Sequence, residues 1–205
     1  VVKPSRQPKL VHVTRPDTSI LNEKQLEIFN KITSMKMNVF SESLLTGYSG
    51  TGKTFLVTKI IEELIAKDKK LRIAITAPTN KAVRVLKNLS SISESHTQVS
   101  FNTLHSLLGL KRTITYDGKE EFTPIFGAQA IDDFHMVLVD EVSMLENKLY
   151  QMLVDSARMS NIMLLFIGDR GQIPPVNGGE SVLFTKGLEN SYNLTEIIRQ
   201  AEGNP

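Results

Sequence analysis

The segment 47–54, which reads GYSGTGKT, restricts the fold of this chain more than any other feature. It matches the pattern G-x-x-x-x-G-K-[ST] at every fixed position. The apolar residues Leu44 and Leu45 precede it and a helix-spaced apolar face follows it, so the segment should join a buried strand to an amphipathic helix. Such a glycine-rich connection lets backbone N–H groups point at phosphate oxygens. The flanking pattern favours a nucleoside triphosphate site over the alternative, an ordinary glycine-rich turn.

The side chains of this phosphate loop suit a triphosphate that carries a magnesium ion. Lys53 is placed to bring a positive charge to the β- and γ-phosphates, and Thr54 can offer its hydroxyl to Mg²⁺. The N-terminus of the helix that follows also favours an anion. The residues predicted to bind ATP in this loop are Gly47, Tyr48, Ser49, Gly50, Thr51, Gly52, Lys53 and Thr54.

Length and composition describe an ordinary globular chain. Its 205 residues suit one sizeable domain, alone or with a small insertion. The absence of cysteine excludes disulfides and thiolate metal sites, and a net charge of +2 neither requires nor excludes a nucleic-acid partner. The chain has no apolar run of membrane-spanning length and no signal-peptide core. Its first residue is Val, and we expect a fragment of a longer protein.

Apolar runs alternate with helical patterns along the chain. Residues 1–19 are expected to form an extended basic arm, or else a flexible terminus that binds nothing. A helix should begin at Asn22, and a short helix is expected over 101–110. Buried strands are expected at 71–77, 136–139 and 161–168, separated by helical segments. This alternation predicts an α/β fold with a central parallel sheet flanked by helices.

One segment departs from that alternation. Residues 111–124 read KRTITYDGKEEFTP, with alternating patterns on both sides of Asp117 and Gly118. An Asp-Gly pair in this position is a strong signal for a tight β-hairpin. Because an isolated hairpin is only marginally stable, it must pack on the core or on a ligand. We therefore predict a domain over 20–205 that is interrupted by a hairpin insertion at 110–131.

Two adjacent acids, Asp140 and Glu141, follow the predicted strand at 136–139. Ligands of open parallel sheets bind at the carboxyl ends of the strands. There Asp140 can hold Mg²⁺ through its water shell, while Glu141 orients or deprotonates the attacking water. The alternative is a pair of acids that caps the next helix. The phosphate loop in the same chain favours the first interpretation.

Two polar segments have both a nucleic-acid and a structural interpretation. Segment 76–82 (TAPTNKA) presents hydroxyl, amide and backbone N–H groups that suit a phosphate backbone, or it caps a helix through Thr79 or Asn80. Thr103 and His105, within FNTLHSL, either contact DNA or belong to a helix start with a hydrogen-bonded histidine.

Two further segments bear on the γ-phosphate. Gln172, in IGDRGQIPPV, can touch the γ-phosphate and sense its presence; the alternative is a proline-rich surface turn. Arg199, in LTEIIRQ, can reach the same group as a guanidinium, or it is a solvated or salt-bridged helix residue.

Taken in order, these segments resemble the first motor domain of a superfamily-1 DNA helicase of the RecD/Dda group. The resemblance runs from residue 21 to residue 200. LNEKQ resembles the adenine-contacting segment of that family, which places Gln25 on the base. The family's motifs I, Ia, Ib, II, III and IV correspond to GYSGTGKT, TAPTNKA, FNTLHSLLG, VDEVSML, GDRGQIPPV and LTEIIRQ.

The resemblance implies a RecA-like phosphate-loop domain that binds ATP and Mg²⁺ and moves on single-stranded DNA, in the 5′-to-3′ direction. The implied catalytic residues are Lys53, Glu141, Gln172 and Arg199, and the implied metal ligands are Thr54 and Asp140. The implied nucleic-acid contacts are Pro78, Thr79, Asn80, Thr103 and His105. The hairpin corresponds to the family's small 1B element, which separates strands as a pin, with Tyr116 or Phe122 as candidate pin residues.

The family also has a second RecA-like domain, to which nothing in this chain corresponds, so the chain alone should not unwind DNA. The implied partners are that second domain, single-stranded DNA, a DNA fork, and replication or recombination proteins, in the cytoplasm of a bacterium or a phage-infected host. Two alternatives stay open. One is a nucleotide-gated module that binds DNA or a partner without turnover. The other is a different phosphate-loop phosphotransferase, which Gln172 and the acid pair at 140–141 disfavour.

Overall fold

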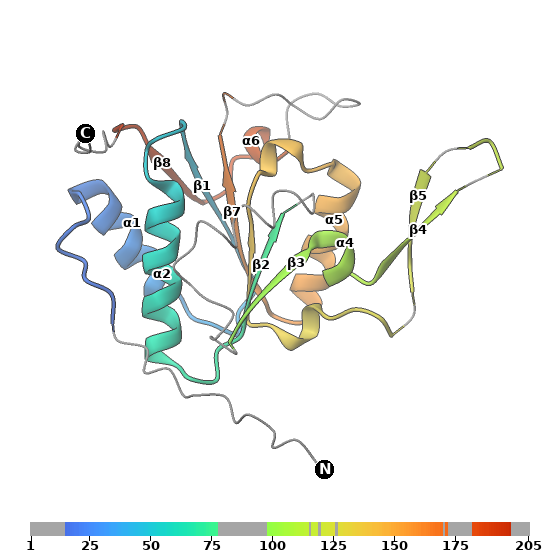
Figure 1. The fold of residues 1–205 in the computed structure, drawn as a ribbon, viewed down its shortest axis with the longest axis horizontal. Coiled ribbons are helices and arrows are strands. Elements are labelled where there is room, and N and C mark those ends of the chain that lie inside the picture. Colours follow the sequence, from blue (N-terminus) through green and yellow to red (C-terminus); the bar gives the residue numbers. More distant parts are fainter. Residues whose placement is uncertain are drawn as a thin grey trace, which may run out of the picture.

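The structure is a computed structural model, and it describes residues 15–77, 98–114, 116–118, 120–125, 127–169, 171 and 182–197. A six-stranded sheet lies at its centre, in the order β3-β2-β6-β7-β1-β8 (Figure 1). All five strand pairings in this sheet are parallel. The strands are β1 (Ser41–Gly47), β2 (Ile73–Ala77), β3 (Val99–Thr103), β6 (Met136–Val139), β7 (Met163–Gly168) and β8 (Asn190–Leu194).

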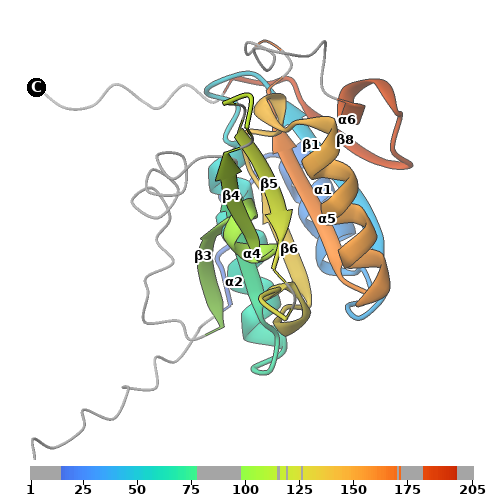
Figure 2. The same ribbon diagram turned by 90° about the vertical axis from the view of Figure 1, so that its right-hand side faces the viewer.

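Helices cover both faces of this sheet, as its apolar strands require. The helices are α1 (Glu23–Thr33), α2 (Lys53–Lys67), α4 (Leu104–Leu107), α5 (Asn147–Met159) and α6 (Val182–Thr185), with short 3₁₀ turns at Ile131–Asp133 and Val142–Met144. The first face packs against α1 and α2, and the second against α4, α5 and α6 (Figures 1 and 2). Strands β2, β6 and β7 are buried along their whole length, which explains their nearly unbroken apolar sequences.

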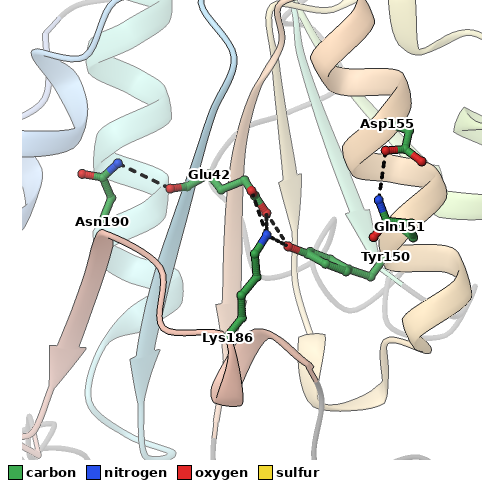
Figure 3. A network of polar contacts seen from close by, with 6 residues as sticks. All are labelled: Glu42, Tyr150, Gln151, Asp155, Lys186 and Asn190. Atoms are coloured by element: carbon green, nitrogen blue, oxygen red, sulfur yellow. Dashed lines mark hydrogen bonds and ion pairs between the residues drawn. The ribbon is translucent and has the colours of Figure 1, made fainter.

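A polar network on the second face fixes the chain between α6 and β8 (Figure 3). The Lys186 ammonium donates to the Tyr150 hydroxyl at 2.8 Å and to a Glu42 carboxylate oxygen at 3.2 Å. Tyr150 in turn donates to Glu42, and the Asn190 amide donates to the Glu42 carbonyl at 3.4 Å. These contacts tie β1, α5 and the start of β8 together, so they set the register in which β8 joins the sheet.

A two-stranded antiparallel hairpin stands beside the main sheet. It consists of β4 (Leu110–Ile114) and β5 (Glu120–Pro124), with Arg112 opposite Phe122. Figure 1 shows it projecting from the domain next to α4, and Figure 2 shows it from its own side. The hairpin surrounds Asp117 and Gly118, and Gly118 has the positive φ of 78° that a tight turn of this kind requires.

The predicted fold class is confirmed: the domain is α/β, with a parallel sheet, flanking helices and a hairpin insertion. The helix predicted over 101–110 is wrong at both ends. Residues up to Thr103 belong to β3, which pairs with β2 through Phe101, and only Leu104–Leu107 is helical before β4 begins. The conformation of residues 101–103 is set by the pairing of β3 with β2. A single sequence does not show which strands are neighbours. The division into 20–205 with an insertion at 110–131 stays a prediction.

Candidate nucleotide-binding site

The candidate site lies at the carboxyl ends of neighbouring parallel strands. The phosphate loop follows β1, the acids Asp140 and Glu141 follow β6, and Asp169 follows β7, which lies between those two strands. Because the strands are parallel and adjacent, all three segments meet at one edge of the sheet. This is the edge at which open α/β sheets bind ligands.

Close backbone approach explains the glycines of the loop. A Cβ atom on Gly47 would lie 2.6 Å from the Thr51 hydroxyl and 2.7 Å from the Leu194 carbonyl oxygen. Gly50 and Gly52 have φ values of 83° and 78°, in the left-handed region that glycine adopts without strain. The first turn of α2 starts directly after Gly52, so its backbone N–H groups open toward the loop.

Lys53 lies over the inside of this loop. Its ammonium donates to the Gly47 carbonyl at 2.6 Å and to the Tyr48 carbonyl at 2.9 Å. Partial burial lowers the pKa of Lys53, while the nearby carboxylates of Asp169, Asp140 and Glu141 act in the opposite direction. The Thr51 hydroxyl also donates to Tyr48, at 2.8 Å. The loop is therefore held in its curved form with a cation already at its centre.

The two acids differ in backbone conformation and in environment. Asp140 continues the sheet, since its N–H donates to the Thr76 carbonyl of β2 at 2.9 Å. Burial raises the pKa of Asp140 to about 6. Glu141 has a left-handed backbone with φ 56° and ψ 40°, and its N–H donates to the Asp140 carboxylate at 2.9 Å. Strained conformations of this kind at non-glycine residues are concentrated at functional sites.

Packing behind Glu141 holds this turn in place. Val142 is fully buried, and a Cβ atom on Gly168 would lie 2.6 Å from its side chain. The end of β7 therefore fits directly against the residue that follows Glu141. A side chain at position 168 would push on this turn and shift the Glu141 backbone.

Gln25 contributes a buried amide near the same edge. The Gln25 backbone N–H donates to the Asn22 side-chain oxygen at 2.8 Å, and the Gln25 side-chain oxygen accepts the Asn22 backbone N–H at 3.2 Å. This capping box starts α1. The Gln25 side-chain nitrogen is buried and has no hydrogen-bond partner within the described part of the chain. A buried donor without a partner is rare, and the acceptor nitrogens of an adenine ring are suitable partners for it.

The segment after β8 links Gln25's helix to the phosphate loop. The Asn22 amide donates to the Glu196 carboxylate at 3.0 Å, and the Ile197 side chain lies 3.7 Å from the position of a Cβ atom on Gly50. One short stretch therefore contacts both the start of α1 and the loop. Residues 196 and 197 therefore bridge the start of the helix that carries Gln25 and the phosphate loop.

Thr54 and Asp140 fit a magnesium ion that arrives with a nucleotide. Thr54 is exposed in the first turn of α2, and Asp140 directly follows β6. Over the ranges that the structure describes, no group of three or more His, Cys, Asp or Glu side chains is arranged around a metal position. Mg²⁺ in nucleotide sites is typically held by one or two carboxylates together with water and phosphate oxygens, and Asp140 offers one such carboxylate.

Thr103 and His105, two of the predicted nucleic-acid contacts, each contact other parts of the protein. Thr103 is the N-cap of α4, and its hydroxyl accepts the Ser106 N–H at 3.2 Å. His105 stacks on Phe122 of the hairpin, with 4.0 Å between ring centroids. Partial burial lowers the pKa of His105. Tyr116 is fully exposed in the hairpin turn, whereas Phe122 faces the domain, so the two candidate pin residues differ in position.

Asp169 was not predicted as a site residue. It is nearly buried directly after β7, and its carboxylate accepts the Gly171 N–H at 2.8 Å. An acid immediately after a predicted buried strand, within the GDRGQ stretch already assigned to the γ-phosphate, is a signal that could have identified it. The predicted residues Pro78, Thr79, Asn80, Gln172 and Arg199, and the arm up to residue 14, lie outside the described residues.

Comparison with known proteins assigns the chain to a family. Residues 20–204 match the family model described as AAA domain, and the chain belongs to that family. It is 30% identical over 185 residues to the ATP-dependent RecD2 DNA helicase of Deinococcus radiodurans, covering 90% of this chain and 22% of that protein. It is 32% identical over 187 residues to the ATP-dependent DNA helicase dda of Enterobacteria phage T4, covering 87% of this chain and 39% of that protein.

Solved structures agree on the fold. The crystal structure of Pif1 helicase from Candida albicans aligns with a TM-score of 0.61 at 22% identity, covering 90% of this chain and 42% of that one. The predicted resemblance to the RecD/Dda group is confirmed by these matches. The chain spans well under half the length of each of these proteins. None of the helices in the described ranges has the length and apolar character needed to cross a bilayer.

Proposed function

We propose that this chain is the first motor domain of an ATP-dependent DNA helicase, which couples ATP hydrolysis to 5′-to-3′ movement on single-stranded DNA and to duplex unwinding. One observation carries the proposal: the phosphate loop with Lys53 and the acid pair Asp140–Glu141 lie at adjacent strand ends, in a chain whose named relatives are DNA helicases. The 5′-to-3′ direction rests on the resemblance to the Dda group alone.

Nucleotide binding uses the pieces described above. The curved loop and the start of α2 offer backbone N–H groups to the phosphates, and Lys53 exchanges its two carbonyl partners for phosphate oxygens. Gln25 presents its buried side-chain amide nitrogen to the base. Thr54 and Asp140 would hold Mg²⁺, which neutralises charge on the β- and γ-phosphates when it is bound.

Hydrolysis requires a base and a way to stabilise charge on the γ-phosphate. Glu141 is proposed to orient and deprotonate the attacking water, and its left-handed backbone turns it out of the line of β6 immediately after Asp140. Gln172 and Arg199 are proposed to contact the γ-phosphate, by resemblance. Closing the site around ATP then needs a second RecA-like domain, because translocation works by opening and closing two domains.

Single-stranded DNA is proposed to cross the surface at which β2 and β3 end. Pro78, Thr79, Asn80 and Thr103 are the proposed contacts, mainly to the DNA backbone, so that binding should be independent of sequence and weakened by salt. The resemblance assigns His105 to the same surface, although its ring lies against the hairpin. The hairpin is proposed to act as the strand-separating pin, with the exposed Tyr116 at its end.

The proposed partners are the second RecA-like domain, a DNA fork, and proteins of replication or recombination. The cytoplasm of a bacterium or a phage-infected cell is the proposed location, on the likeness to phage and bacterial proteins. These assignments rest on the family resemblance, and the site geometry bears only on the ATP step.

The test is unwinding of a fluorescently labelled forked duplex by a protein that joins this chain to a second RecA-like domain. We expect ATP-dependent unwinding of a fork with a 5′ tail, little on a 3′ tail, and none with Glu141→Gln. Unwinding from the 3′ tail would overturn the direction. ATP binding without turnover, even with DNA and the second domain present, would favour the alternative of a nucleotide-gated binding module.

A further inference from the structure

The hairpin leaves the domain at a single crossing point. Gly109 has a φ of 62°, and a Cβ atom there would lie 2.6 Å from the Ala128 carbonyl carbon. The outgoing and returning chains therefore touch at this position. Two backbone hydrogen bonds join them, from Ile125 N–H to the Gly109 carbonyl at 2.9 Å and from Ala130 N–H to the Leu107 carbonyl at 3.0 Å.

Away from this crossing the hairpin is largely exposed. The side chain of Ile114 is 71% exposed and that of Tyr116 is fully exposed. A two-stranded ribbon has little stability of its own and gains rigidity only where it packs on something else. The hydrogen bonds at the crossing fix where the ribbon starts, and contacts farther along the ribbon are needed to set its angle.

The ring contact between His105 and Phe122 lies away from that line. His105 is on α4, which is anchored by the buried side chains of Leu104 and Leu107. Its ring centroid is 4.0 Å from that of Phe122, with the planes tilted by 42°. Phe122 lies in the middle of β5, opposite Arg112. The contact therefore joins a residue fixed to the core with a residue partway along the projecting ribbon.

We propose that His105 is a positioning residue, which acts through Phe122 to set the angle at which the hairpin leaves the domain. The proposal rests on the hairpin's proposed role in strand separation. The low pKa that burial gives His105 keeps the ring neutral at neutral pH, so the stack forms without removing a charge from water. His105 thus matters through the face of its ring, whereas a direct nucleic-acid contact by hydrogen bonding needs its ring nitrogens.

A distance measurement tests the positioning directly, and the chain is well suited to it because it contains no cysteine. Cysteines introduced by Tyr116→Cys in the hairpin turn and Met159→Cys at the exposed end of α5 provide two spin-label sites in the full chain. Pulsed electron paramagnetic resonance then reports the distribution of the distance between them. We expect a single narrow distribution in the parent pair.

Three variants in this background separate the possibilities. His105→Ala and Phe122→Ala should each broaden the distribution, and combining them should add little, because each removes the same contact. His105→Phe keeps an aromatic face and should keep the narrow distribution. Far-UV circular dichroism and ATP affinity identify any variant that fails to fold. A distribution that stays narrow in both folded alanine variants would overturn the proposal.

Unwinding by the two-domain protein gives the second readout. We expect His105→Ala to slow unwinding by about ten- to 100-fold, since misplacing a functional group by about 1 Å can cost up to about 100-fold, and His105→Phe to restore most of the rate. Equal loss of single-stranded DNA affinity in His105→Phe and His105→Ala would contradict the proposal and assign the imidazole to the nucleic acid. If the protein unwinds nothing at all, the distance distributions still decide the positioning role.

Discussion

The phosphate loop begins at Gly47 and the hairpin is entered through Gly109. A Cβ atom at either position would clash with neighbouring backbone, yet the surroundings of the two segments differ. The loop lies between Leu45 of β1 and Leu56 of α2, which are both completely buried. The hairpin extends from Gly109 with exposed residues such as Ile114. The loop is therefore shaped by the core on both sides, whereas the hairpin is joined to the domain at the crossing point and through the ring contact of His105 with Phe122.

This difference separates two kinds of functional element. The chemistry of the loop depends on backbone geometry within eight residues, and the core holds that geometry whatever the rest of the protein does. The work proposed for the hairpin depends on its direction relative to the domain, which is set by residues distant in sequence. Changes in the loop should therefore abolish nucleotide chemistry, and changes at the hairpin should act on unwinding while the ATP site stays intact.

The largest effect is expected from Lys53→Ala. Removing the ammonium from the loop should lower ATP affinity or turnover by at least about 100-fold, since it removes the principal fixed charge at the phosphates. Isothermal titration calorimetry with Mg·ATP measures the affinity, and circular dichroism checks folding. Lys59→Ala, which removes a lysine paired with Glu62 on the same helix, is the matched control and should bind ATP normally. Normal ATP affinity in the Lys53 variant would remove the site assignment.

Shortening the hairpin should give the opposite pattern. Replacing residues 112–122 with a short Gly-Ser connection should leave ATP affinity within about twofold, because the loop's contacts lie elsewhere, and should strongly slow unwinding by the two-domain protein. Calorimetry and fork unwinding measure the two effects on one preparation. Unwinding at the parent rate would show that the hairpin is not the pin.

Gly109 at the base of the hairpin and Gly118 in its turn test whether the crossing point holds the hairpin in place. Gly109→Ala should lower the free energy of unfolding by about 2–4 kcal/mol, because it adds a backbone clash with Ala128 to left-handed strain. Gly118 also has a positive φ, but no atom of the described residues lies within 4 Å of a Cβ atom added there, so Gly118→Ala is expected to cost about 1 kcal/mol. Urea unfolding measures both. Equal losses would mean that the crossing at Gly109 relaxes and does not fix the hairpin.

A further effect depends on pH and concerns Asp140, the proposed metal ligand, in the chain without nucleotide or Mg²⁺. Burial raises the pKa of Asp140 in the folded chain from 3.8 to about 6. Above pH 6 the folded state therefore holds a buried charge that the unfolded state exposes to water, and this lowers stability; below about pH 4 both states are protonated and the cost disappears. Asp140→Asn should stabilise the chain by on the order of 2 kcal/mol at pH 8 and by much less at pH 4. Thermal unfolding at the two pH values measures this. An equal change in Tm at both would contradict the burial of this charge.

The sequence was sufficient for features set by local rules. The loop, its strand and helix, the acids after β6 and the hairpin turn at Gly118 each have a short pattern with one physical cause. The sequence was insufficient where the local structure depends on contacts with residues distant in the chain. β3 exists because it pairs with β2, and the stack of His105 on Phe122 joins residues 17 positions apart that no local pattern relates. The left-handed backbone of Glu141 was likewise not predicted; it directly precedes Val142, which packs against the end of β7, a contact between residues distant in sequence.

The central claim is that this ATP site is driven by nucleic acid, and its most direct test is the rate of ATP hydrolysis with and without single-stranded DNA. The measurement uses the chain joined to a second RecA-like domain, with Glu141→Gln as the control. We expect single-stranded DNA to raise turnover several-fold or more, and the control to bind ATP while its turnover falls by about 10²–10⁴-fold. An ATP turnover rate that is the same with and without single-stranded DNA would contradict the account. So would a Glu141→Gln control that hydrolyses ATP as fast as the parent protein.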